Sequence, residues 1–88
     1  MEIKTYFIEQ NKTYMDKFYY ILEKVCKTIK DDSIVTNISK GITLCERTNN
    51  LLSENDISIG TVVRIQSELY ENLKPLITAV EKRVELFL

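Results

Sequence analysis

The last third of the chain carries the longest apolar pattern, and this pattern limits what the chain can fold into. Between Ile59 and Leu88, three rows of residues recur at seven-residue spacing and lie side by side along one face of an α-helix. A stripe this wide must be covered by other helices or by another chain. The rows are Ile59, Gln66, Leu73, Val80 and Phe87; Val62, Leu69, Leu76 and Arg83; and Val63, Tyr70, Ile77 and Val84.

Two earlier segments show the same helical periodicity. Residues 3–30 place Phe7, Tyr14 and Ile21 in one row, and residues 34–52 place Ile34, Ile38 and Ile42 on one face. Gly41 lies inside the second segment, where it costs about 1 kcal/mol relative to alanine but permits a neighbouring helix to approach closely. The pattern therefore predicts helices in both segments.

Short polar stretches separate the three segments and offer helix caps. Asp31-Asp32-Ser33 precedes the second segment, and either Asp56 or Ser58 is suited to cap the third. Pro75 lies on the polar side of the third segment and should bend it. A break into two helices near Leu73 is the alternative. We favour one kinked helix because the apolar rows pass through the proline without a change of phase.

These observations predict an all-α fold for the whole chain, taken as one domain spanning residues 1–88. The expected architecture is a small antiparallel three-helix bundle, with helices at about 3–30, 34–52 and 58–88 and a kink at Pro75. Alanine is scarce, and isoleucine, lysine and asparagine are abundant. This bias is typical of AT-rich genomes such as those of many viruses and phages.

Composition narrows the classes of function that we expect. The formal net charge is −1, which gives the whole chain no electrostatic reason to bind nucleic acid or anionic lipid. No apolar run is long enough to span a membrane, and the N-terminus lacks a secretory leader pattern, so we expect a cytoplasmic protein. Histidine is absent, no phosphate-binding loop is present, and the glutamates of the third segment lie on its polar face. We therefore expect no enzyme, no cofactor and no metal site.

The two cysteines, Cys26 and Cys45, fall on the expected inner faces of the first two helices. Buried thiols of this kind usually act as small apolar side chains. A disulfide between them is the alternative, provided that their Cα atoms come close enough. A zinc site is disfavoured because there is no histidine and no Cys-x-x-Cys pair.

Several residues are candidates for contact with another protein. Tyr19 and Tyr20 are adjacent, so they diverge by about 100° on a helix, and we expect one to pack and the other to cover a flank or to anchor a partner. Gln66 and Arg83 are polar residues within apolar rows, a feature that commonly sets register or oligomeric state, although Arg83 also suits a snorkelling role. The full set of candidates is Tyr19, Tyr20, Gln66, Leu73, Leu76, Val80, Arg83 and Phe87.

The segment 57–65 reads Ile-Ser-Ile-Gly-Thr-Val-Val-Arg-Ile. It resembles the opening of the recognition helix in winged-helix and helix-turn-helix regulators, which often read I-S-x-G-T-V-x-R. The resemblance implies DNA binding, with hydroxyls of Ser58 and Thr61 on phosphates and Arg64 on a base or a phosphate. A capped amphipathic helix explains the same letters. Glu68 and Glu71 depart from the resemblance because they would face DNA phosphates.

The sequence thus predicts a non-enzymatic helical protein-interaction module that acts as an adaptor, inhibitor or assembly factor. The expected partner is a protein, with self-association as a homodimer through coiled-coil-like packing of the apolar rows. Neither nucleic acid nor a membrane is expected as a partner. The alternative is a helix-turn-helix DNA-binding transcriptional regulator that uses Ser58, Thr61 and Arg64.

Overall fold

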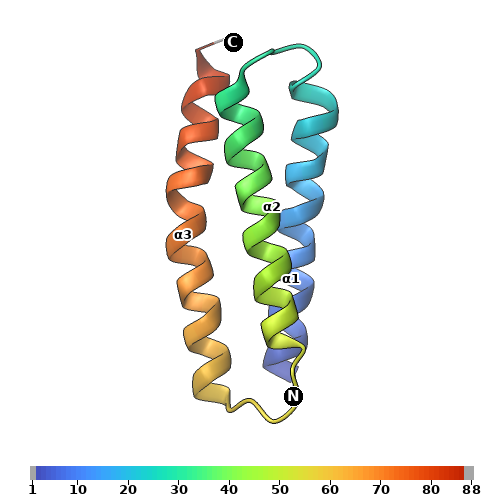
Figure 1. The fold of residues 1–88 in the computed structure, drawn as a ribbon, viewed down its shortest axis with the longest axis vertical. Coiled ribbons are helices and arrows are strands. Elements are labelled where there is room, and N and C mark those ends of the chain that lie inside the picture. Colours follow the sequence, from blue (N-terminus) through green and yellow to red (C-terminus); the bar gives the residue numbers. More distant parts are fainter. Residues whose placement is uncertain (1, 87–88) are drawn as a thin grey trace.

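A computed structural model describes residues 2–86 and contains three long helices that lie side by side (Figure 1). They are α1 (Glu2–Tyr20), which continues into a π-helical segment η1 (Ile21–Val25), α2 (Asp32–Leu52) and α3 (Ile59–Glu85). The chain runs up through α1, down through α2 and up again through α3, in a body of 45 × 20 × 16 Å. This confirms the predicted all-α three-helix bundle. Helix α2 packs closely along both neighbours, whereas α1 and α3 approach each other at few positions.

The polar stretches cap the helices as predicted. A carboxylate oxygen of Asp31 accepts the backbone N–H of Ser33 at 2.8 Å and begins α2. Ser58 Oγ accepts the backbone N–H of Thr61 at 3.2 Å and begins α3. Each cap satisfies a donor that has no partner inside its own helix.

The first helix ends earlier than the sequence predicts. Helical structure stops at Val25 instead of about residue 30, and residues 26–28 form a turn. The last segment is wound as a π-helix, in which the Cys26 N–H bonds to the Ile21 carbonyl at 3.0 Å. The β-branched residues Val25, Thr28 and Ile29 weaken the local preference for helix.

Helix α3 runs through Pro75 without a break, so the prediction of one helix is correct and the two-helix alternative is wrong. Pro75 is exposed. Proline has no N–H to donate to the carbonyl of Glu71, and on the outer face water takes the place of that donor. The proline therefore costs the bundle less there than it would on the inner face.

All three helices contribute to the core, but it covers the stripe of α3 only in part. Leu69, Leu73 and Val80 are buried, whereas Val63 remains 42% exposed. The row of Tyr70, Ile77 and Val84 is only half-buried. The helices of one chain therefore leave one side of the stripe uncovered. The buried apolar cluster consists of Phe18, Ile34, Ile38, Ile42, Cys45, Leu69, Leu73 and Val80.

Gly41 lets α1 and α2 approach closely, as the sequence predicts. A Cβ atom at this position would lie 2.8 Å from Cε2 and 2.9 Å from Cζ of Phe18, whose ring is buried in the core. We expect Gly41→Ala to lower the free energy of unfolding by about 1–3 kcal/mol through overpacking, even though alanine favours helix. Urea denaturation followed by circular dichroism measures the change.

Gly60 provides the matched control for this substitution. It lies in the first turn of α3, and its nearest neighbour would be Ser58 Oγ at 4.0 Å from an added Cβ. Gly60→Ala should leave stability unchanged or raise it by less than about 1 kcal/mol. Equal effects of the two substitutions would contradict the role assigned to Gly41.

Candidate functional site

A buried cluster of three amides joins the three helices. Asn11 Nδ2 of α1 donates to Asn49 Oδ1 of α2 at 2.9 Å and to Gln66 Oε1 of α3 at 3.0 Å. Gln66 Nε2 returns a bond to Asn11 Oδ1 at 2.8 Å, and Asn49 Nδ2 donates to the Ile8 carbonyl at 3.2 Å. Among residues 2–86, no buried side-chain nitrogen or oxygen lacks a partner. This amide cluster fixes the register of the helices, because a shifted helix would leave buried amides unpaired.

Of the three residues in the amide cluster, the sequence singled out only Gln66. Gln66 stood out as a polar residue in an apolar row, but its partner is Asn11 of the same chain. Asn49 was visible only as an interruption of the apolar face of the second segment. Asn11 carried a weaker signal, namely that it stands seven residues before Phe18 and so shares its face.

Of the other residues that we expected to contact a protein partner, some lie in the core and some on the surface. Leu73 and Val80 are buried inside the bundle, and Leu76 is half-buried. Tyr19 and Tyr20 are 47% and 62% exposed, so the expectation that one of them packs in the core is wrong. Both side chains are therefore largely open to solvent. Phe87 lies outside the described residues.

Arg83 joins two helix ends instead of lying in a seam. Its Nε lies 3.3 Å from Oδ2 of Asp31, whose other carboxylate oxygen caps α2. The guanidinium side chain is 48% exposed, so solvent screens this ion pair. The pair therefore adds little stability but ties the end of α3 to the start of α2.

A groove runs between α1 and α3, the two helices that approach each other least; we call it the α1–α3 groove. It has a volume of about 370 Å³. The rings of Tyr14 and Tyr70 meet edge-on across it, with centroids 6.5 Å apart, and the Tyr70 hydroxyl donates to Gln10 Oε1. Burial, followed by the nearby Tyr70, raises the pKa of Tyr14. The residues that line the α1–α3 groove are Gln10, Tyr14, Ser67, Tyr70, Glu71, Leu73, Lys74 and Ile77.

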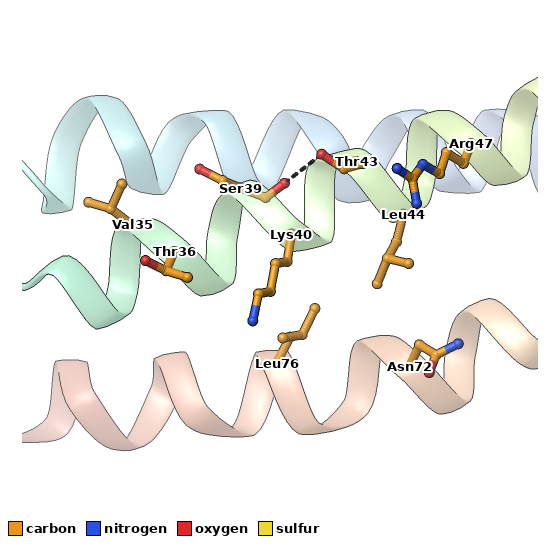
Figure 2. Close-up of a pocket in the computed structure, with 9 residues that line it drawn as sticks. All are labelled: Val35, Thr36, Ser39, Lys40, Thr43, Leu44, Arg47, Asn72 and Leu76. Carbon is orange, nitrogen blue, oxygen red and sulfur yellow. Dashed lines mark hydrogen bonds between the residues drawn. The ribbon is translucent and has the colours of Figure 1, made fainter.

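A larger and shallower groove lies between α2 and α3; we call it the α2–α3 groove. Its volume is about 790 Å³. Figure 2 shows Leu44 and Leu76 extending into the space between the two helices, with Lys40 reaching from α2 toward α3. Arg47 stands one heptad beyond Lys40 on the same helix. The groove thus combines an apolar floor with two cations. The other lining residues are Val35, Thr36, Ser39, Thr43 and Asn72.

Both cysteines are free thiols, so the disulfide alternative is not realised in this structure. Cys45 is fully buried, as predicted, and Cys26 is half-buried. Burial, with a smaller effect from Glu46, raises the pKa of Cys45 to about 11. Burial and the nearby Asp31 also raise the pKa of Cys26. Both shifts favour the neutral thiol, which is the less nucleophilic form. Within residues 2–86, no group of three or more Cys, Asp or Glu side chains is placed to hold a metal ion.

The raised pKa of Cys45 predicts a loss of stability in alkali. The folded state holds this proton more tightly than the unfolded state, so the contribution is complete below the ordinary pKa of 9.0 and is lost as pH rises toward about 11. Across this window we expect stability to fall by about 2 kcal/mol more in the wild type than in Cys45→Ala. Urea titrations at several pH values measure the two slopes. Parallel slopes for the wild type and Cys45→Ala would contradict the assignment.

The residues that resemble a recognition helix serve as a helix cap in the structure. Ser58 Oγ accepts the Thr61 N–H and also donates to Thr61 Oγ1 at 2.9 Å, so these hydroxyls bond to each other. Arg64 is exposed on the first turns of α3. Helices α2 and α3 lie antiparallel along the bundle (Figure 1), whereas the helices of a helix-turn-helix cross at about 90–120°.

No family model, curated protein or solved structure matches this chain. No helix within residues 2–86 is long and apolar enough to cross a membrane. The function must therefore be inferred from the surfaces of the bundle itself, above all from the two grooves.

Proposed function

We propose that this protein is a small non-enzymatic protein-interaction module that self-associates and acts as an adaptor, inhibitor or assembly factor. The observation that carries the proposal is the uncovered side of the α3 stripe. Val63 is 42% exposed and Ile59 is 58% exposed, while Tyr70 and Ile77 are only half-buried along the same helix. Contiguous apolar surface of this kind is typical of faces that another protein covers.

The size of the hydrophobic effect supports this proposal. Full burial of a valine or isoleucine side chain stabilises by about 1.5–3 kcal/mol relative to its exposed state. A domain of this length has a stability near the lower end of the range for single domains, about 5 kcal/mol. Covering a few more of these side chains in an assembly would therefore add a large fraction to the stability of the fold.

The ionisable groups with shifted pKa values support a non-catalytic role. The pKa values of Cys45, Cys26 and Tyr14 are all raised, and in each case burial is the largest cause. A catalytic thiol or phenol usually needs the opposite shift, because the anion is the reactive species. These side chains also pack against or within the apolar core. These side chains therefore contribute to packing and not to a reaction.

Self-association should appear as a dependence of thermal stability on protein concentration. When only the folded chain associates, mass action raises the midpoint of unfolding as concentration rises. A tenfold increase in concentration should shift the midpoint upward by several degrees for a domain of this size. Far-ultraviolet circular dichroism at several concentrations tests this. A midpoint that does not change with concentration would overturn the self-association in this proposal.

A gel-shift assay distinguishes the interaction module from the DNA-binding alternative. The two hydroxyls of Ser58 and Thr61 bond to each other, and the nearby Glu68 and Glu71 are exposed. We expect no retardation of mixed-sequence duplex DNA even at low salt, where phosphate contacts are strongest. Retardation that is lost in Arg64→Ala would instead support the regulator.

A further inference from the structure

The α1–α3 groove is bordered by two heptad rows that no helix of the chain covers fully. Phe7 and Tyr14 of α1 and Ile21, the first residue of η1, form one row, which we call the α1 row, and all three are half-buried. The α3 row consists of Val63, Tyr70, Ile77 and Val84, of which none is buried. The two rows meet where Tyr14 contacts Tyr70. They form a long apolar face that has the seven-residue spacing of helix–helix packing on both sides.

The second groove is less suited to a copy of the same chain. Lys40 and Arg47 lie on the α2–α3 groove, one heptad apart. The salt bridges among residues 2–86 include neither of these cations. About a two-fold axis perpendicular to the helices, these cations would approach their own counterparts. About a parallel axis they would face α3 of the other copy, whose lining residues Asn72 and Leu76 carry no negative charge. Charge therefore favours the α1–α3 groove for self-association.

The rims of the α1–α3 groove carry opposite charge. Lys17 and Lys24 follow the α1 row by three residues, beyond Tyr14 and Ile21. On α3, Glu81 follows Ile77 by four residues and Glu85 stands one turn further on. None of these four side chains takes part in an ion pair within the described part of the chain. Lys74 on the α3 rim already faces Glu71 at 4.0 Å.

Contacts between α1 and α3 fix the positions of the rim lysines and glutamates along the long axis of the bundle. Asn11 bonds Gln66, and Tyr14 contacts Tyr70, so the two parallel helices advance together. Lys24 and Glu81 stand ten and eleven residues beyond these tyrosines and so lie at similar heights. A two-fold axis parallel to the helices keeps each height and places α1 of one copy against α3 of the other. A perpendicular axis would place lysine rims against lysine rims.

We infer that a second copy of this chain covers the α1–α3 groove, about a two-fold axis parallel to the helices, so that α1 of each copy packs along α3 of the other. In this dimer Lys24 of each copy faces Glu81 of the other, and the α1 row of each copy packs against the α3 row of the other. The inference rests on the proposed self-association and specifies the surface that mediates it.

Two exposed valines provide a matched test of the surface. Val63 stands one heptad before the groove residue Tyr70 and is 42% exposed, whereas Val35 lines the α2–α3 groove and is 40% exposed. Sedimentation velocity should show that Val63→Asp weakens the dimer by a hundredfold or more, on the order expected for an unpaired charge in an apolar contact. Val35→Asp should dimerise like the wild type. Circular dichroism verifies that both variants remain helical.

Reversal of the rim charges tests the arrangement of the two copies. One variant carries Lys17→Glu and Lys24→Glu, and the other carries Glu81→Lys and Glu85→Lys. Each variant alone should dimerise about tenfold or more weakly than the wild type, because like charges then face each other at both rims. An equal mixture should form a heterodimer, in which every rim contact is again complementary.

The outcomes separate the two proposals. A wild type that stays monomeric at all concentrations overturns the self-association itself. A wild-type dimer that Val35→Asp dissociates and Val63→Asp does not would leave self-association standing and overturn the α1–α3 surface. A dimer that tolerates Lys17→Glu with Lys24→Glu would overturn the arrangement of α1 against α3, because a contact of α1 with α1 repels equally before and after the reversal.

Discussion

Replacing Asn11 with alanine is expected to remove most of the stability of the fold. The change removes the donor to both Asn49 and Gln66 and the acceptor for Gln66, while the remaining amides stay buried. Each buried polar group without a partner costs about 1–3 kcal/mol, so the loss amounts to about 3–5 kcal/mol. A domain of this length has only about 5 kcal/mol in total. Circular dichroism with urea titration measures the change.

Two control variants show that the cost comes from the unpaired amides. Asn50→Ala changes an exposed asparagine on α2 and should alter stability by less than about 0.5 kcal/mol. A triple variant with leucine at Asn11, Asn49 and Gln66 removes all three amides together and should fold at least as stably as the wild type. We expect its nuclear magnetic resonance spectrum to broaden as the register loses its definition. If Asn11→Ala unfolds at the wild-type urea concentration, the amide cluster does not have this role.

The second large effect is expected from Leu73→Asp. Leu73 is 2% exposed and belongs to the apolar cluster shared by all three helices. A carboxylate buried at this position loses its water, at a cost of several kcal/mol that is comparable to the stability of the domain. Thermal and urea denaturation should show no cooperative transition at neutral pH.

The same substitution on the surface serves as the control. Leu51 is 46% exposed near the end of α2, so Leu51→Asp keeps its carboxylate in water. We expect it to cost about 1 kcal/mol or less. A Leu73→Asp variant that unfolds cooperatively near the wild-type midpoint would show that Leu73 is not essential to the core that the three helices share.

The sequence predicts those features of the fold that depend on neighbouring residues. The three helices follow from a periodicity that any window of each segment displays. The caps at Asp31 and Ser58 follow from side chains that bond backbone groups two or three residues away. Gly41 falls on the buried face of α2, so its use for a close approach was also predictable, although the partner Phe18 was not.

Features that depend on contacts between residues far apart in the sequence could not be predicted from it. The first helix ends in a π-helical segment in which Ile21 and Leu22 pack against the core, and the local apolar pattern did not indicate this change of winding. Tyr19 and Tyr20 share one helix, and only the packing of α2 and α3 decides that both side chains remain exposed. Asn11 was missed because a single polar residue within an apolar face gains meaning only from its two partners on α2 and α3.

Periodicity also could not show how much of the α3 stripe a single chain would cover. The rows of Val62 and Val63 look equivalent in sequence, yet Val62 is fully buried and Val63 is 42% exposed. The difference arises because α2 packs closely on one side of α3, whereas α1 stands further away on the other. The open side is the surface that we assign to a second copy.

The mass of the protein in solution tests self-association most directly. Sedimentation equilibrium at two concentrations about a hundredfold apart separates monomer from dimer when the dissociation constant lies between them. We expect the mass to rise from the chain value of 10.3 kDa toward twice that value as concentration increases. A mass of 10.3 kDa at both concentrations would contradict the proposal that this bundle acts by self-association.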